Sequence, residues 1–126
     1  QVTRTRSSAK AAGARFERVI DDYLAATIDE RIDRRVKTGA KDRGDIAGVR
    51  HMGHRIVLEV KDYGGRMLPA EWTAEAEVER GNDDALAGFV IVKRRGVSAP
   101  GDQYVVGTLA QFVALITGER PVQEVT

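Results

Sequence analysis

The sequence predicts an α/β domain in which helices flank a central mixed β-sheet, in the order α-β-β-β-α-β-β-α. Three patterns support this fold class. Apolar residues recur every three or four positions within residues 8–28, as in an amphipathic helix. Two runs rich in β-branched residues, 43–50 and 55–61, are separated by a glycine-containing turn, which is typical of a hairpin. Residues 87–92 form a nearly continuous apolar run, which is typical of a strand buried on both faces.

Length and composition indicate a single domain over residues 1–126 with a modest core. We expect no membrane partner, because no apolar run is long enough to span a bilayer and no signal peptide opens the chain. The absence of cysteine excludes disulfides and thiol chemistry, and it fits the reducing cytoplasm, where we expect the protein to be located. The net charge of +1 does not by itself indicate a nucleic-acid partner.

The amino-terminal part combines a basic segment with the first helix. Residues 1–10 carry three cations and no acid, so we expect a flexible basic arm that either contacts phosphates or is a plain terminus. Glu17 lies beside the apolar stripe of the helix over 8–28, where it can reach the rim of a groove at the core. Arg15 and Arg18 flank Glu17 and would suit a phosphate that approaches the same place.

A densely basic stretch follows over residues 30–43. Ile32 and Val36 predict a short first strand within it. Such a run is either solvated surface or a contact with a nucleic-acid backbone. We favour the contact, because the run leads directly to Asp45. The residues expected to contact DNA here are Arg35, Lys37, Lys41 and Arg43.

The hairpin that follows can form in two registers, and a shift of one residue exchanges its two faces. A two-residue turn at 52–53 would pair His51 with His54. A three-residue loop over 51–53 would pair Arg50 with His54. We expect the three-residue loop, because it has glycine at its last position, where such loops turn left-handed.

The register decides which side chains share a face. In the three-residue register Asp45 lies directly across from Glu59, and Lys61 points to the same side because alternate residues of a strand do so. The opposite face would be the core face, with Ile46, Ile56, Leu58 and Val60.

Asp45 and Glu59 facing each other would repel by roughly a few tenths to 1 kcal/mol. A divalent cation would offset this repulsion, because Mg²⁺ binds carboxylate oxygens and keeps several waters. Lys61 could then orient or deprotonate a water, or stabilise charge on a phosphate. The alternative is a solvated, salt-bridged strand face that contributes little.

The second half of the chain supplies the remaining elements. The glycine-rich residues 62–66 predict a mobile loop over the site. Pro69 suits the first turn of a helix whose buried side includes Trp72 and which carries the candidate site residues Glu71 and Glu75. The strand over 87–92 ends in Lys93, Arg94 and Arg95. An edge strand follows at 103–106, and then a helix from Thr108 to Gly118 and a tail over 119–126. The apolar stripe of this last helix is Leu109, Phe112, Val113, Leu115 and Ile116.

Two sequence motifs resemble those of known nucleases. Gly44-Asp45-Ile46, a gap of strand length and then Glu59-Val60-Lys61 resemble the motif of the PD-(D/E)xK nuclease superfamily. The helix with Gly13-x2-Phe16-Glu17 is similar to the first helix of archaeal-type Holliday junction resolvases and their phage and RecB-like relatives. The helix opened by Leu68-Pro69 and the strand at 89–93 follow in the order that this family uses. The resemblance covers about residues 13–95.

The chain departs from the family pattern at two places. The proline that usually precedes the first motif aspartate is Gly44 here. The glutamine or lysine often found on the second helix has no clear counterpart. Only Glu71 and Glu75 are available there, so the fourth site residue stays open.

The resemblance implies a restriction-endonuclease-like core and a metal-dependent endodeoxyribonuclease that cleaves branched DNA, most simply a Holliday junction resolvase. Asp45, Glu59 and the carbonyl of Val60 would hold Mg²⁺, with Mn²⁺ as an alternative. Lys61 would position the attacking water, and Glu17 would complete the acidic pocket. The expected DNA contacts are Arg15, Arg18, Arg35, Lys37, Lys41, Arg43, Lys93 and Arg94.

A resolvase that makes paired, symmetric cuts would be a homodimer, by analogy with the family. Three alternatives remain open. They are a nuclease of another specificity, such as an exonuclease or a restriction-like enzyme, a non-catalytic nucleic-acid-binding module on the same fold, and a plain interaction domain.

Overall fold

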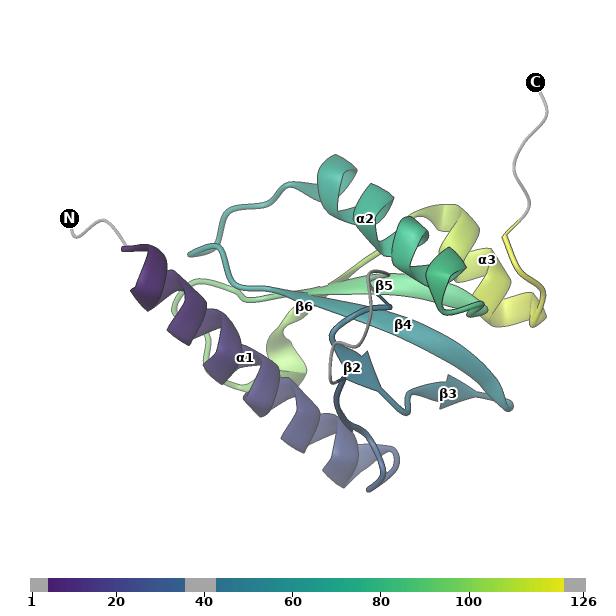
Figure 1. Ribbon diagram of the computed structural model, residues 1–126, viewed down its shortest axis with the longest axis horizontal. Coiled ribbons are helices and arrows are strands. Elements are labelled where there is room, and N and C mark those ends of the chain that lie inside the picture. Colours follow the sequence, from purple (N-terminus) through teal and green to yellow (C-terminus); the bar gives the residue numbers. More distant parts are fainter. Residues whose placement is uncertain (1–4, 36–42, 122–126) are drawn as a thin grey trace.

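The computed structural model describes residues 5–35 and 43–121, and Figure 1 shows how their elements are arranged. Within these ranges it has three α-helices, which are α1 Arg6–Thr27, α2 Pro69–Asn82 and α3 Leu109–Thr117. The strands are β1 Asp33–Arg34, β2 Ile46–Ala47, β3 Arg50–His51, β4 His54–Lys61, β5 Ala87–Val92 and β6 Tyr104–Val106, with a 3₁₀ turn η1 at Pro100–Asp102 before β6. The predicted α/β class is confirmed. No helix in the described ranges combines the length and apolar character needed to cross a membrane.

The strands form one mixed sheet, as predicted. Its order is β1-β2-β4-β5-β6, and β3 pairs with β4 beyond the end of β2. Strands β4 and β5 are parallel, with Ile56 beside Ala87 and Lys61 beside Val92, and the other pairs are antiparallel. Helix α2 makes the crossover that a parallel pair requires.

Helices α1 and α2 cover opposite faces of this sheet (Figure 1). On β5, Ile91 belongs to one hydrophobic cluster and its neighbours Val90 and Val92 to another, because alternate residues of a strand face opposite ways. Phe16 and Ile20 of α1 pack in the first cluster, with the four predicted core residues of the hairpin, Ile46, Ile56, Leu58 and Val60. The second cluster contains Trp72 and Ala76 of α2. The predicted core faces are confirmed.

The predicted three-residue hairpin loop is wrong. His51 pairs with His54, so the turn consists of Met52 and Gly53 alone. Both turn residues have left-handed backbones, with φ of 51° and 83°. A two-residue turn with positive φ at both positions matches the twist of the flanking strands. The prediction failed because it required a glycine only at the last position, whereas Met52 also adopts this conformation.

A β-bulge nevertheless brings Asp45 to the place that the sequence predicted. The pairs Arg50–Arg55 and Ile46–Leu58 are separated by four residues along the segment from β3 back to β2. Along β4 they are separated by only three residues. The additional residue lies next to Gly48, whose φ is +94°. A Cβ there would lie 3.1 Å from the carbonyl oxygen of Arg31, so both the positive φ and the close contact favour glycine at this position. The bulge shifts the register by one and returns Asp45 to the side of Glu59.

The amino-terminal boundaries also differ from the prediction. Helix α1 begins at Arg6, because Thr5 caps it by accepting a hydrogen bond from the Ser8 amide at 3.1 Å. The second half of the expected arm, residues 6–10, is therefore helical, and residues 1–4 lie outside the described ranges. The predicted first strand is found at Asp33–Arg34, while Val36 lies outside those ranges.

Helix α3 has the predicted bounds but not the expected burial. It follows Thr108 and ends at Gly118, which has the left-handed φ of 75° typical of a helix end. Four of the five residues of its apolar stripe are exposed, namely Leu109, Phe112, Val113 and Ile116. Ala114 and Gln111 are buried instead. The side of α3 that carries Gln111 and Ala114 packs on the sheet, so most of the apolar stripe lies on the side that the described residues leave exposed.

Candidate active site

A cleft of about 1260 Å³ opens where the parallel strands β4 and β5 end. The carboxyl ends of parallel strands are the usual place for ligands in α/β sheets. The cleft is lined by Ala9, Gly13, Glu17, Asp45, residues 59–66 and residues 93–96. It therefore brings together seven of the predicted site residues, namely Glu17, Asp45, Glu59, Val60, Lys61, Lys93 and Arg94.

Asp45 is held rigidly at the floor of the cleft. Its side chain is buried, and its Oδ2 accepts a hydrogen bond of 2.8 Å from the Val60 amide. Its own amide donates to the carbonyl of Leu58 at 3.0 Å, and its carbonyl accepts from the Arg35 amide at 2.8 Å. These bonds fix the carboxylate beside the end of β4.

The backbone conformation explains why a glycine, Gly44, precedes Asp45. Gly44 has φ of +93°, whereas proline is confined to φ near −65°. A Cβ at Gly44 would lie 2.9 Å from Cγ1 of Val57. Proline could therefore not replace Gly44 on this backbone path into Asp45.

Glu59 lies buried against a second glutamate, Glu79 of α2, which lies one turn after Glu75 and was expected with it as a possible neighbour of the site. Burial raises the pKa of Glu59 to about 10, with further contributions from a hydrogen bond to Glu79 of α2 and from the charge of Asp45. Glu79 is also buried. A hydrogen bond between two buried carboxyl groups requires a proton between them. The second oxygen of Glu59, Oε2, has no hydrogen-bond partner among the described residues.

Lys61 is a half-buried cation between two carboxylates. Its Nζ lies 2.9 Å from Oε2 of Glu75 and 3.7 Å from Oε1 of Glu59. Burial works to lower the pKa of Lys61, but the hydrogen bond to Glu75 and the charge of Glu59 outweigh it, so the pKa is raised. Lys61 is therefore positioned to orient a water or stabilise negative charge, and it is poorly suited to act as a base.

Two glutamates of α2 contact the candidate site residues of β4. Glu75 contacts Lys61, and Glu79, one turn later on α2, contacts Glu59. Glu71 is exposed and does not line the cleft. The sequence signal for this outcome is the spacing of four between Glu75 and Glu79, which places both on one side of the helix.

Glu17 reaches the cleft from α1, as expected. Its Oε2 lies 3.9 Å from Nε of Arg34. One turn later, Asp21 is buried and neither of its oxygens has a hydrogen-bond partner within the described ranges. Burial raises the pKa of Asp21 to about 7, and the charges of Asp33 and Glu17 add to this effect. Asp21 was not predicted from the sequence, although its place next to Ile20 of the apolar stripe is a visible signal.

The predicted DNA-contacting residues separate into groups. Lys93 and Arg94 line the cleft, together with Arg66 and Arg95. Arg15, Arg18 and Arg43 are exposed but are not part of the cleft lining. Arg35 instead donates to Asp83 at 3.3 Å. Lys37 and Lys41 lie outside the described ranges.

The glycine-rich loop forms one wall of the cleft. Gly65 has φ of +92°, and a Cβ there would lie 2.8 Å from Cβ of Arg95, so the loop packs closely on the segment after β5. Tyr63 packs edge-on against Trp72, with ring centroids 5.2 Å apart, and Trp72 is buried as predicted. The loop therefore places Tyr63 beside Lys61, whose Nζ lies 5.9 Å from the Tyr63 ring centroid.

The donor atoms in the cleft fit a hard cation that retains waters. Two carboxylates and the carbonyl of Val60 are oxygen donors, and Mg²⁺ is commonly bound by one or two carboxylates with several waters. The unsatisfied Oε2 of Glu59 is a donor atom that a cation would satisfy. Among the described residues no group of three or more His, Cys, Asp or Glu side chains is arranged to hold a metal.

Comparisons with known proteins leave the family open. No family model matches the chain, and neither the curated proteins nor the solved structures give a significant match.

Proposed function

We propose that this chain is a metal-dependent endodeoxyribonuclease that cleaves branched DNA, with a four-way junction as its preferred substrate. The observation that carries the proposal is the meeting of Asp45, Glu59 and Lys61 with Glu17 in one cleft. Glu17 comes from α1, Asp45 directly precedes β2, and Glu59 and Lys61 belong to β4. They are the residues that the nuclease motif and the first helix of the family single out. A solvated strand face would not bury both carboxylates.

The charges around the cleft support a phosphodiester as the substrate. Arg66, Lys93, Arg94 and Arg95 line the same cleft as the carboxylates. A bound Mg²⁺ would neutralise the carboxylates and polarise the phosphate. The arginine and lysine side chains would then attract the backbone on either side of the scissile bond. This combination of acids at the floor and cations at the wall suits hydrolysis of a polyanion.

The residues of the cleft have distinct roles in this proposal. Asp45, Glu59 and the carbonyl of Val60 hold the metal. Lys61, kept protonated by Glu75, orients the attacking water and stabilises charge on the phosphate oxygens. The water oxygen bonds to phosphorus as the bond to the 3′ oxygen breaks, which leaves a 5′-phosphate and a 3′-hydroxyl. Glu17 accepts hydrogen bonds from waters at the rim.

The preference for branched DNA rests on the resemblance of the first helix and the motif order to junction resolvases. Paired cuts across a junction require two active sites related by symmetry, so we propose that the working form is a homodimer.

The test is cleavage of a labelled four-way junction, a linear duplex and a single strand, each with Mg²⁺ and with EDTA. We expect metal-dependent cuts at paired symmetric positions of the junction. Metal-dependent cutting of linear DNA or single strands alone would leave the site in place but overturn the junction preference. An intact junction in Mg²⁺ and Mn²⁺, with the protein shown to be folded, would overturn the nuclease assignment.

A further inference from the structure

A second cationic surface lies at the opposite end of β4 from the cleft. We call it the hairpin patch and define it by Arg50, His51, His54, Arg55 and Arg120. Residues 50–55 are all exposed, and the sequence from 46 to 58 contains no acid. No described carboxylate lies within ion-pairing distance of Arg50, whose guanidinium reaches only the Gly53 carbonyl, at 3.4 Å. Within the described residues, Arg50 therefore carries a positive charge that no carboxylate neutralises.

A hollow of about 300 Å³ lies within this patch. It separates the β3–β4 hairpin from the chain that follows α3. The lining residues are Gly53, His54, Arg55, Asp84, Leu86, Gly118 and Arg120. Two arginines line it, Arg55 of β4 and Arg120 of the chain after α3, and guanidinium groups bind anionic groups well.

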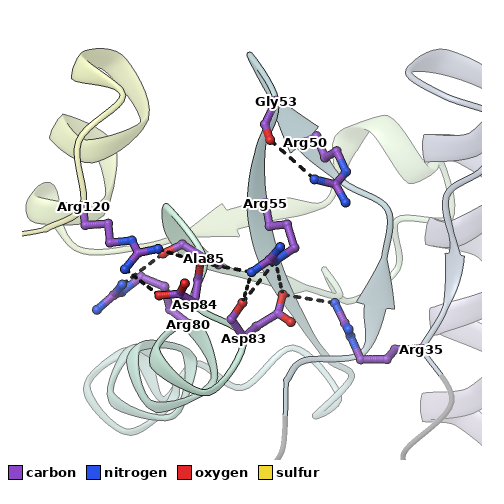
Figure 2. A network of polar contacts seen from close by, with 9 residues as sticks. All are labelled: Arg35, Arg50, Gly53, Arg55, Arg80, Asp83, Asp84, Ala85 and Arg120. Carbon is purple, nitrogen blue, oxygen red and sulfur yellow. Dashed lines mark hydrogen bonds and ion pairs between the residues drawn. The ribbon is translucent and has the colours of Figure 1, made fainter.

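Two aspartates hold the arginines in place, as Figure 2 shows. The carbonyl of Asp83 accepts from Nε of Arg55 at 3.1 Å and from its Nη2 at 2.7 Å, and the Asp83 carboxylate lies 3.6 Å from the same Nε. Arg120 forms an ion pair with Asp84 at 2.5 Å. Each side chain is thus fixed before any ligand binds, which lowers the cost of ordering it.

Arginines outnumber aspartates around the hairpin patch. Asp83 also pairs with Arg35, at 3.3 Å. Four of the five arginines labelled in Figure 2, at positions 35, 50, 55 and 120, therefore face two aspartates, which leaves two positive charges in excess. The fifth, Arg80, pairs with Glu77. Arginine presents five N–H donors, so a guanidinium that already contacts one carboxylate can still bind phosphate.

The distance between the hairpin patch and the cleft can be compared with the spacing of base pairs along DNA. Strand β4 has eight residues, which at about 3.3 Å per residue places its two ends about 23 Å apart. Since base pairs rise by about 3.4 Å along each strand, this distance corresponds to about seven base pairs.

We propose that the hairpin patch binds a backbone phosphate of the same DNA molecule, about seven base pairs from the phosphate in the cleft. This inference rests on the proposed function, because it takes DNA as the substrate. The contact is to backbone alone, so it adds affinity and orientation without reading sequence.

The experiment measures binding by fluorescence anisotropy in EDTA, so that no cleavage occurs. Two four-way junctions are compared, one with arms of about 5 base pairs, too short to reach the patch, and one with arms of about 15 base pairs. The test variants are Arg50→Gln and Arg120→Gln. The matched control is Arg31→Gln, because Arg31 is also an exposed arginine that pairs with one nearby aspartate, Asp29, at 2.8 Å.

We expect each test variant to bind the long-armed junction about tenfold more weakly than wild type at 0.1 M salt, and to lower the salt slope by about one. Binding of the short-armed junction should not change, and Arg31→Gln should bind both junctions as wild type does. Equal binding of the long-armed junction by wild type and both test variants would overturn the hairpin patch. An equal loss on short and long arms would also overturn it.

These outcomes are separable from a failure of the proposed function. If wild type fails to cut any DNA in Mg²⁺ but the test variants lose affinity for long arms alone, the patch stands and the nuclease assignment falls. If wild type cuts junctions while both test variants bind as wild type does, the nuclease stands and the patch falls.

Discussion

At the scale of single residues, the site depends on carboxylates that the fold buries at a cost. Asp45 is satisfied by the Val60 amide, whereas Glu59 is accommodated by sharing a proton with Glu79. Buried charges are normally paired or bound to metals. The two acids therefore differ in role. Asp45 is positioned by the backbone, and Glu59 is the group whose charge state would change when a cation binds.

The first prediction concerns these two acids. Asp45→Asn and Glu59→Gln should each lower the rate of junction cleavage by at least about a hundredfold, because a metal supplies several kcal/mol of transition-state stabilisation and each 1.4 kcal/mol is a factor of ten. DNA affinity in EDTA should change by less than about threefold. Single-turnover cleavage assays measure the rate. Glu71→Gln is the control, since Glu71 is exposed on the same helix that carries Glu79. Wild-type rates in either acid variant would remove that residue from the metal site.

The second prediction concerns the buried Asp21. Its pKa is raised from 3.8 to about 7, so the folded state holds a proton that the unfolded state releases between these values. The resulting stability is fully present below pH 3.8 and is lost as the pH rises to about 7. Asp21→Asn should therefore remove this loss and be the more stable protein at pH 8, by about 1.4 kcal/mol for each unit of pKa difference.

Urea denaturation from pH 5 to pH 8 measures this effect. The raised pKa of Glu59 acts in the same direction and is shared by both proteins, so the difference between wild type and Asp21→Asn isolates Asp21. The exposed neighbour Asp22 provides the control variant Asp22→Asn. A wild-type pH dependence in Asp21→Asn would show that Asp21 is not the titrating group.

At the scale of elements, the hairpin shows how two local features combine to place one residue. The turn at Met52 and Gly53 by itself would put Asp45 on the wrong face of the strand. The bulge at Gly48 corrects the register by one residue. Both features need positive φ, but only Gly48 is also in close contact with another segment.

The third prediction separates these two requirements. Gly53→Ala should lower the free energy of unfolding by about 1–2 kcal/mol, because a Cβ at φ of 83° is strained but meets nothing within 4 Å. Gly48→Ala should cost more, since its Cβ would also lie 3.1 Å from the Arg31 carbonyl. It should lower cleavage as well, because Asp45 depends on the bulge. Denaturant titration and cleavage assays test this order. Equal stability and activity of the two variants would show that the close contact at Gly48 is unimportant.

Most helices and strands could be predicted from the sequence. The predictions failed where contacts with other parts of the fold determine the conformation or the burial of a segment. The apolar periodicity over 8–28 identified a helix, and the continuous apolar run over 87–92 identified a buried strand. Both predictions succeeded because the pattern of apolar residues follows the faces that become buried. The turn type was wrong because a methionine with positive φ is uncommon and no pattern signals it. The exposed stripe of α3 was misjudged because an apolar stripe does not reveal whether anything covers it.

For the candidate site, too, local sequence patterns were informative and contacts between elements could not be predicted. Asp45, Glu59 and Lys61 were expected on one face because of a three-residue loop that the hairpin does not have, and the bulge at Gly48 restores this arrangement. Glu17 was expected at the site from its place beside an apolar stripe, and it lines the cleft. The contact between Glu59 and Glu79 depends on how α2 packs across the sheet, which no local pattern in the sequence specifies.

At the scale of the whole molecule, the proposed function requires more than one copy of the chain. The described residues form one cleft that contains the motif residues, and one cleft cuts one strand at a time. Paired cuts across a junction therefore need two protomers related by a two-fold axis, with each cleft facing one of the opposed strands.

The fourth prediction tests this arrangement with mixed protomers. Wild-type chain is mixed with an excess of Glu59→Gln chain, so that most wild-type protomers have an inactive partner. If the protein works as a homodimer, these mixed dimers will nick one strand of the junction and leave the opposite strand intact. The number of cuts is read from a supercoiled plasmid with an extruded junction, because a single nick gives the open circular form and paired cuts give the linear form. Wild type alone should give mainly linear plasmid, and the mixture mainly open circles. Linear product in unchanged proportion to total cutting, whatever the excess of Glu59→Gln, would mean that each protomer cuts independently and that the dimer is not the working form.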